Sequence, residues 1–326
     1  MKYTLDLVLS NILGLKVIIT DDKDQFRLYE GPKMSYCFRP LDDEVHLTSV
    51  DFLFQTGIEE QELKVIEVDG LPAFFKTKET SLFPFDLFAL SFYLVSRYEE
   101  YLPHIRDLYD RFDPKESIAV KNRFIKRPLV NLWAKRLKDK LLLVYPDLKF
   151  DKRSYHFIPT LDVDNAYAYR QKGIVRTLGA AAKLGMKFQF KKLAQQQKVV
   201  FGLKHDPYDT FDHLNHVHEQ FNVRPIYFFL VADYGLNDKN VPFESRKFQY
   251  LIKSTADVAD IGIHPGFISN QNVDKLEKEI KRLAGVLKRD VTKSRQHFLK
   301  LTLPDTYRNL IHFDIQEDYS MGYAAT

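Results

Sequence analysis

The sequence of 326 residues predicts an α/β protein with two domains, an α+β domain of unknown role over residues 1–150 and an incomplete or distorted (β/α) barrel over residues 151–326. The length alone favours two domains, because it exceeds the usual size of one. Up to residue 150, short β-like runs separated by Asp, Gly and Pro turns precede two helical patterns. From about residue 155, strand and helix patterns alternate, which is typical of a parallel sheet covered by helices.

The first domain is expected to contain three short strands and two helices. The β-like runs are rich in branched and aromatic residues and lie at residues 16–20, 34–40 and 63–68. The helical patterns at 84–102 and 130–146 each have a broad apolar face, and the second stops at a proline.

The second domain is expected to contain five strands with helices between them. The strand patterns cover residues 156–164, 224–233, 258–264, 295–301 and 315–320, and the clearest helical patterns cover 209–221 and 273–287. Five strands are fewer than a closed barrel of this kind requires, so the barrel is expected to be truncated. In (β/α) barrels the chemistry lies at the carboxyl ends of the strands, which makes polar residues there the candidates for a site.

The composition excludes several classes of protein. Hydrophobic residues make up 45% and charged residues 28%, which is ordinary globular usage. No window approaches the roughly 18 uninterrupted apolar residues of a membrane span, and the N-terminal segment shows no cleavage site. Cys37 is the single cysteine, so an intramolecular disulfide and a thiolate metal cluster are excluded. A net charge of +4 gives no support for nucleic acid as a partner, and we expect a cytoplasmic protein.

Two carboxylates separated by one residue end the first strand of the second domain, in the motif TLDVDN at 160–165. Strand alternation places Asp162 and Asp164 on the same face. One could bind a metal ion while the other takes a proton from a water molecule that the ion activates. The alternative is that Asp164 or Asn165 caps the next turn or helix.

Further candidate residues follow the third strand and lie within the fourth. His264 ends an apolar run before a Pro-Gly turn and can offer a neutral imidazole to a metal, although a polar histidine at a strand end needs no ligand. In the fourth strand, alternation places Arg295 and His297 on one face. Arg295 could orient a catalytic carboxylate or be a surface residue, and His297 could bind a metal or lie at the edge of the core.

These motifs together resemble the polysaccharide deacetylases of carbohydrate esterase family 4, and more closely an uncharacterised bacterial branch with an extra N-terminal domain. The resemblance covers about half of the chain. It implies that Asp162 is the catalytic base, that Asp164 and His264 bind the metal, and that Arg295 orients the base. Asp318 lies where the family has a further acidic motif, and could steady Arg295 or be a solvated turn residue.

The sequence departs from the family pattern at two places. The second metal-binding histidine of the family corresponds to Ile268, which cannot bind a metal. From strand geometry, and not from the family, His297 is the candidate for this third ligand. The last family motif supplies a histidine that acts as general acid. No equivalent strand precedes Thr326, and His312 lies earlier, on a predicted helix, which makes it a poor substitute. The expectation is therefore that the sequence is a fragment, or that the acid is absent or recruited from elsewhere.

The resulting expectation is a metal-dependent hydrolase that removes an N-acetyl or similar acyl group from an amino sugar. The cofactor is expected to be a divalent metal, zinc by preference, held by Asp164, His264 and His297. The substrate is a glycan or a lipid- or nucleotide-linked precursor, and a homo-oligomer is compatible with the sequence. The alternative is an inactive barrel that binds glycans or serves as a scaffold. A glycosidase ranks lower, because carboxylates two residues apart on one strand lie too close together to flank a sugar bond.

Two other features of the sequence are candidate interaction sites. Residues 165–205 contain nine Lys or Arg and no acidic residue, with apolar side chains between them. A cationic amphipathic helix of this kind can make peripheral contact with an anionic membrane, or can simply be a solvated face. The helix at 209–221 carries three histidines, but His218 points away from the other two, which disfavours a zinc site there.

Overall fold

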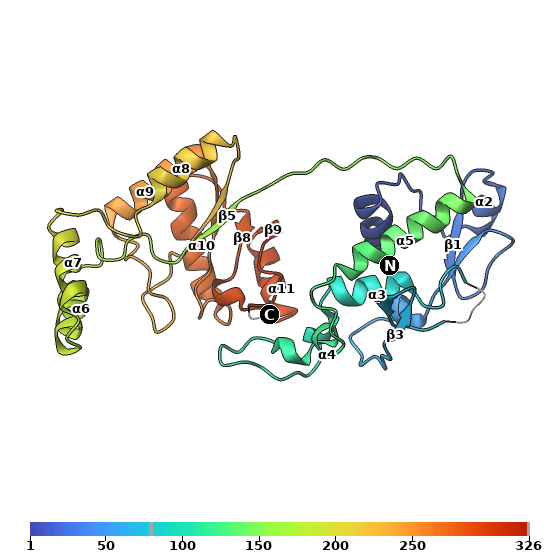
Figure 1. Cartoon of the computed structure of the whole chain (residues 1–326), viewed down its shortest axis with the longest axis horizontal. Helices are drawn as coiled ribbons and strands as arrows, with labels where there is room; N and C mark the ends of the chain where they lie inside the picture. Colours follow the sequence, from blue (N-terminus) through green and yellow to red (C-terminus); the bar gives the residue numbers. More distant parts are fainter. Residues whose placement is uncertain (78–80, 325–326) are drawn as a thin grey trace. The chain divides into compact units, whose positions relative to one another are not determined.

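The computed structural model describes residues 1–77 and 81–324, and the chain forms two compact units. The first unit comprises Met1–Arg106 and Phe112–Tyr155. The second comprises Asp107–Arg111 and His156–Thr326, so a short segment flanked in sequence by residues of the first unit belongs to the second. Figure 1 shows the course of the chain.

The first unit combines helices with two small sheets. The strands β1 (Met34–Cys37) and β2 (Val45–Thr48) pair in parallel, and β3 (Ile66–Val68) and β4 (Leu71–Ala73) pair antiparallel. The helical segments are α1 (Lys2–Leu5), η1 (Asp6–Ile12), α2 (Lys23–Leu28), η2 (Asp51–Phe54), α3 (Leu87–Val95), η3 (Tyr98–Tyr101), η4 (Pro114–Glu116), α4 (Ile118–Lys121) and α5 (Leu129–Val144).

The expected elements of this unit appear with one clear exception. The run at 16–20 was expected as a strand but is irregular, and the side chains of Ile18 and Ile19 are exposed. Branched residues favour strands only where a neighbouring strand and a packed face support them. The helix expected at 84–102 is shorter, because Arg97 takes a left-handed conformation with φ +53° between α3 and η3.

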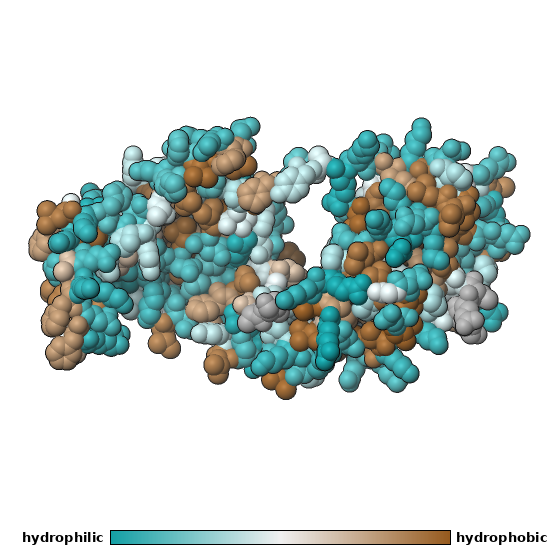
Figure 2. Space-filling model, viewed as in Figure 1, coloured by the Kyte–Doolittle hydropathy of each residue, from teal (hydrophilic) through white to brown (hydrophobic). Residues whose placement is uncertain are grey.

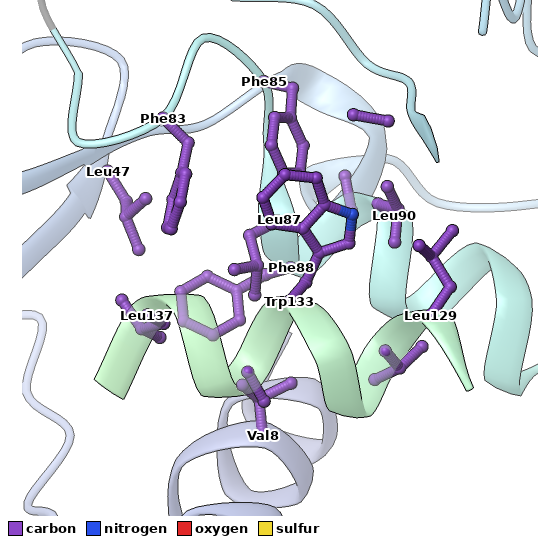
Figure 3. Packing of buried hydrophobic residues seen from close by; sticks show 14 of the residues in the cluster. Val8, Leu47, Phe83, Phe85, Leu87, Phe88, Leu90, Leu129, Trp133 and Leu137 are labelled. Carbon is purple, nitrogen blue, oxygen red and sulfur yellow. The ribbon is translucent and has the colours of Figure 1, made fainter. Parts of the chain in front are cut away.

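Aromatic side chains fill the core of the first unit. Trp133 on α5 is fully buried against Phe83 and Phe85, whose ring centroids lie 5.5 and 4.5 Å from its own (Figure 3). The indole Nε1 donates a hydrogen bond of 2.8 Å to the carbonyl oxygen of Pro72, so this large ring is buried with its polar atom satisfied.

The second unit alternates strands and helices. Its strands are β5 (Thr160–Val163), β6 (Ile226–Phe229), β7 (Asp260–Ile263), β8 (Lys293–Ser294) and β9 (Glu317–Asp318). Its helical segments are α6 (Ile174–Met186), α7 (Phe190–Val200), α8 (Phe211–Gln220), α9 (Arg246–Val258), α10 (Val273–Leu287), η5 (His297–Leu299) and α11 (Asp305–His312).

In the described part of the chain, the five strands of this unit form one parallel sheet in the order β5-β6-β7-β8-β9. Each strand therefore pairs with the next strand along the chain, as the alternating pattern predicted. The second strand of the sheet, β6, is buried along its whole length, and α9 and α10 pack against the central strand β7. Because the strands are parallel, their carboxyl ends meet at one edge of the sheet.

The fourth strand is shorter than expected. Residues 295–301 were predicted as a strand, but β8 ends at Ser294 and His297 begins the 3₁₀ turn η5. Phe298 and Leu299 have φ of +61° and +52°, values that an extended strand cannot contain. Strand alternation therefore does not place Arg295 and His297 on one face, and the prediction that rested on it was wrong in its reason.

Among the described residues, none of the helices is long and apolar enough to cross a membrane.

Candidate metal centre

Three side chains converge at the carboxyl edge of the parallel sheet. Asp164 follows β5, His264 follows β7 and His297 lies in the turn after β8. One potential ligand atom from each lies within 4.8 Å of the other two. The Oδ1 atom of Asp164 is 3.1 Å from Nε2 of His264 and 3.6 Å from Nε2 of His297. Residues far apart in the sequence are thus brought together by the parallel topology.

The other ring nitrogen of each histidine faces an acceptor. Nδ1 of His264 lies 2.5 Å from the carbonyl oxygen of Arg295, and Nδ1 of His297 lies 2.9 Å from Oδ1 of Asp238. A carbonyl or carboxylate oxygen can only accept, so Nδ1 carries a proton in both rings. In the neutral tautomer this leaves the lone pair on Nε2, the nitrogen that faces Asp164. Metal-binding histidines are oriented in the same way.

This arrangement fits a divalent metal ion. Zinc in catalytic sites takes three protein ligands, commonly histidines and a carboxylate, and keeps one position open. Ligand atoms about 2 Å from a tetrahedral ion lie roughly 3.4 Å from one another. The separations of 3.1 and 3.6 Å between Asp164 and the two histidines are close to that value. Both histidines are buried, while the Asp164 side chain is 58% exposed, so the centre opens to solvent on one side.

The three groups also perturb each other electrostatically. The hydrogen-bond contacts of Asp164 with His264 and His297 hold the pKa of Asp164 well below its usual range, against the opposing effect of burial. Burial disfavours the charged His297 ring, but hydrogen bonds to Asp164 and Asp238 outweigh it and raise the pKa of His297 to about 9. Binding of a divalent ion at Nε2 of His297 therefore requires a proton to leave.

A carboxylate and an arginine lie beside the cluster. Asp162 lies in β5, two residues before Asp164, and its Oδ1 accepts a hydrogen bond of 3.0 Å from Nη1 of Arg295. The guanidinium also donates to Oγ1 of Thr160 at 2.9 Å and to the carbonyl oxygen of Tyr319 at 3.2 Å. Each side-chain nitrogen of Arg295 therefore has a hydrogen-bond partner. The guanidinium is held in place and in turn orients the Asp162 carboxylate.

Asp318 in β9 is held by Ser320 and lies within the electrostatic influence of Arg295. Its carboxylate accepts hydrogen bonds from the backbone N–H and the hydroxyl of Ser320, at 3.0 and 2.9 Å. Burial raises the pKa of Asp318, while Ser320 and, less strongly, the charge of Arg295 oppose that rise. The next residue, Tyr319, accepts a hydrogen bond from Nε of Arg295 at its carbonyl oxygen.

The remaining sequence candidates lie outside the cluster. Ile268 is exposed, and His312 is an exposed residue at the end of α11. Of the residues proposed from the sequence, the structure brings together Asp162, Asp164, His264, Arg295 and His297.

Two buried carboxylates that support the site were missed by the sequence analysis. Asp238 binds Nδ1 of His297 and also accepts from the backbone N–H of Phe267 at 2.9 Å. Glu279 on α10 accepts from the N–H of Gly266 at 2.8 Å and from the hydroxyl of Ser269 at 2.6 Å, and so holds the turn that follows His264. Glu279 stands three residues after the buried Leu276 and four before the buried Leu283, and a charged residue in that apolar stripe was a usable signal.

Gly266 is required by the close packing of this turn. A Cβ atom there would lie 2.7 Å from Cβ of Ala232 and 3.1 Å from Oε1 of Glu279. Any other residue would therefore push the turn away from the carboxylate that holds it. The Pro-Gly pair after His264 is explained by this approach.

The segment Asp107–Arg111 supports the turn that carries His297. Nη1 of Arg111 donates to the carbonyl oxygen of Phe298 at 2.7 Å, and the ring of Tyr109 stacks on that of Phe298 with centroids 4.9 Å apart. Asp110 also lies 3.2 Å from the buried ammonium of Lys300. These contacts help to stabilise the left-handed backbone of η5.

Comparison with known proteins gives one match, to the first half of the chain. A family of unknown function (DUF7033) matches residues 1–146. No curated protein and no solved structure matches the chain. The matched range ends before Asp162, so the candidate metal centre lies entirely outside it.

Proposed function

We propose that the second unit is a metal-dependent carbohydrate deacetylase, a hydrolase that removes an N-acyl group such as acetyl from an amino sugar. The observation that carries the proposal is the convergence of Asp164, His264 and His297 beside the Asp162–Arg295 pair. The resemblance of these motifs to polysaccharide deacetylases supplies the substrate class. In this proposal the five sequentially ordered parallel strands are part of a (β/α) barrel of that type, and His297 replaces the histidine that the family has at the position of Ile268.

The proposed roles follow from the contacts. A divalent ion, zinc by preference, supplies the charge that polarises an acyl carbonyl and makes water nucleophilic near neutral pH. Asp162 accepts the proton of the attacking water, and the hydrogen bond from Arg295 holds that carboxylate in position. Asp238 and the carbonyl of Arg295 hold the two imidazoles. Asp162 then passes this proton to the amine nitrogen as the C–N bond breaks, so the carboxylate is regenerated and the amine leaves protonated.

The substrate is proposed to be an amino-sugar glycan or a lipid- or nucleotide-linked precursor in the cytoplasm. The first test uses short N-acetylglucosamine oligomers, which carry the N-acetyl group of this substrate class. Acetate release is the direct readout.

The metal ligands are tested by metal analysis of the purified protein. Asp164→Ala, His264→Ala and His297→Ala should each lose most of the bound divalent metal, because each removes one of three ligands. His312→Ala is the matched control, since this histidine is exposed on α11 and should leave the metal content unchanged. Equal metal content in the wild type and all three ligand variants would contradict the assignment.

The catalytic role is tested separately. Asp162→Asn should retain the metal but reduce acetate release by at least about a hundredfold, because the amide cannot accept the proton. An inactive glycan-binding scaffold is the competing function, and the isoleucine at position 268 favours it. That function predicts oligomer binding and bound metal without acetate release from the wild type.

A further inference from the structure

The helical hairpin α6–α7 in the second unit is strongly cationic. Between Asn165 and His205 the chain contains nine Lys or Arg and no Asp or Glu. The two helices pack against each other, and Nε2 of Gln196 donates to the carbonyl oxygen of Thr177 at 3.0 Å. Four lysines at and around the turn between the helices are exposed: Lys183, Lys187, Lys191 and Lys192.

Helix α6 has three distinct faces. Ile174, Val175, Leu178 and Met186 recur at helical spacing and are all exposed, with Ile174 79% and Val175 85% accessible. Thr177, Ala181 and Leu184 are half-buried and lie on the side of α7. Lys183 and Lys187 occupy the third face, next to the apolar one. An exposed apolar stripe thus runs beside a basic stripe.

The turn and the end of the hairpin add further exposed apolar groups. Phe188 in the turn is 80% accessible, and its ring centroid lies 6.1 Å from that of Phe190, which is also exposed. After α7, Phe201 and Leu203 are exposed as well. Brown apolar residues lie among teal hydrophilic ones where Figure 1 places α6 and α7 (Figure 2). Together these side chains form an apolar surface larger than scattered single residues would give.

The hairpin is anchored to the loop that supports the metal centre. Arg176 donates to the carbonyl oxygens of Asn240 and Lys239 at 3.0 and 3.1 Å and lies over the ring of Tyr234. Asp238, which orients His297, belongs to the same loop. The base of the hairpin is therefore fixed, while the apolar face and the lysines around the turn stay exposed.

We infer that the α6–α7 hairpin, residues 174–200, binds the surface of an anionic lipid bilayer. Exposed apolar residues enter the interface between headgroups and acyl chains, and the adjacent lysines contact anionic headgroups. A second copy of the chain is a poor partner, since two hairpins without acidic residues repel each other. Nucleic acid would satisfy the lysines, but it offers nothing to the aliphatic stripe of α6. The inference does not depend on the proposed deacetylase activity.

The test is co-sedimentation of the full chain with vesicles. Vesicles of phosphatidylcholine with about one quarter phosphatidylglycerol should bind at least about tenfold more protein than pure phosphatidylcholine. Raising sodium chloride from about 0.02 M to about 0.5 M should release most of the protein, because salt screens exposed charges.

Two multiple variants separate the basic and the apolar contributions. Lys183→Gln, Lys187→Gln, Lys191→Gln and Lys192→Gln combined should weaken binding at least about tenfold. The combination of Leu178→Gln, Met186→Gln, Phe188→Asn and Phe190→Gln should do the same. Matched controls remove four charges elsewhere on the second unit, at Lys247, Lys253, Lys288 and Arg289, or four exposed apolar residues, at Phe221, Leu236, Tyr250 and Ile311. Both controls should bind as the wild type does.

Several outcomes would overturn the inference. Absence of wild-type binding to anionic vesicles, or equal binding to neutral ones, contradicts it directly. Equal loss in the hairpin variants and in their controls would mean that net charge or general hydrophobicity is responsible. Tight binding of an RNA or DNA oligonucleotide without vesicle binding would assign the basic stripe to nucleic acid.

Discussion

Asp86 in the first unit and Asp238 in the second are both almost completely buried carboxylates, yet they serve different purposes. Asp86 accepts hydrogen bonds of 2.8 Å from the hydroxyl of Tyr36 and from the backbone N–H groups of Val50 and Ala89. It caps α3 and ties that helix to β1 and to the segment after β2. Asp238 instead orients His297, whose other nitrogen faces the partly exposed Asp164.

The histidines of the two units differ in the same way. His46 in β2 is buried with both ring nitrogens near hydroxyl groups, 2.9 Å from Ser35 and 3.3 Å from Thr48. His264 and His297 each have one nitrogen held by the protein and the other directed at Asp164. Burial of a polar residue therefore does not by itself distinguish a structural role from a functional one. What distinguishes them is whether a potential ligand atom remains directed at an open position.

The largest effect expected from this comparison is on the stability of the first unit. Asp86→Ala leaves three donors without their acceptor, and we expect a loss of about 3–5 kcal/mol in the free energy of unfolding. Trp133 is the single tryptophan of the chain and lies in the first unit, so its fluorescence in urea titrations reports this loss. Asp139→Ala, an exposed position on α5, is the control and should change stability by less than about 0.5 kcal/mol. If folded Asp86→Ala protein bound less metal than the wild type, the distinction between a structural Asp86 and a site-supporting Asp238 would be wrong.

A smaller effect is expected when Asp238 is changed. Asp238→Asn keeps the shape of the side chain but weakens the acceptor for Nδ1 of His297, so zinc affinity should fall by about 10–100-fold. Competition with a chromophoric chelator measures this affinity. Asp257→Asn, an exposed position on α9, should leave it unchanged. Unaltered affinity in Asp238→Asn would reduce Asp238 to a structural residue like Asp86.

The fold could be predicted where the pattern itself determines the structure. The helix expected at 273–287 is α10 with the same bounds, and the alternation of strands and helices gave the parallel sheet in sequential order. The strand expected at 16–20 failed because Val17 packs against the core while Ile18 and Ile19 are exposed, so the run has no alternating packed face. The fourth strand was predicted too long because the backbone turns at Phe298, which has a positive φ. Glycine is the residue that usually signals a positive φ, and there is no glycine at this position.

The residues of the site could be proposed from their places after apolar runs, but Asp238, which supports His297, could not. His297 was selected on the assumption of an extended strand, and it reaches Asp164 from a 3₁₀ turn instead. Asp238 lies in an irregular loop after β6. In such a loop no helical or strand periodicity in the sequence indicates which way a side chain points. Its contact with His297 spans 59 residues of sequence and exists only because the parallel strands bring both loops to one edge.

The buried acids of the two units also predict how stability depends on pH. Burial raises the pKa of Glu279 to about 7, and it raises that of Glu100 in the first unit to about 7 as well. Glu100 forms an ion pair with Arg97, whereas Glu279 accepts from Ser269 and Gly266. Because an unfolded glutamate titrates near 4.3, the folded protein binds more protons than the unfolded one between about pH 4.3 and 7. The stabilisation is complete below that window and is lost as the pH rises through it.

The last prediction isolates Glu279 from this shared behaviour. Glu279→Gln removes one titrating group while keeping a polar side chain at the turn after His264, so the stability of the second unit should decline less steeply between about pH 5 and 7. The slope lost is at most about 1.4 kcal/mol per pH unit, the value for one proton. Hydrogen exchange of α10 amides, corrected for the intrinsic pH dependence, measures the second unit alone. Glu277→Gln, on the same helix and paired with Lys281 at the surface, is the matched control and should retain the wild-type slope. If Glu279→Gln and the wild type gave parallel profiles, Glu279 would be ionised throughout, and the turn after His264 would be held by a charged carboxylate.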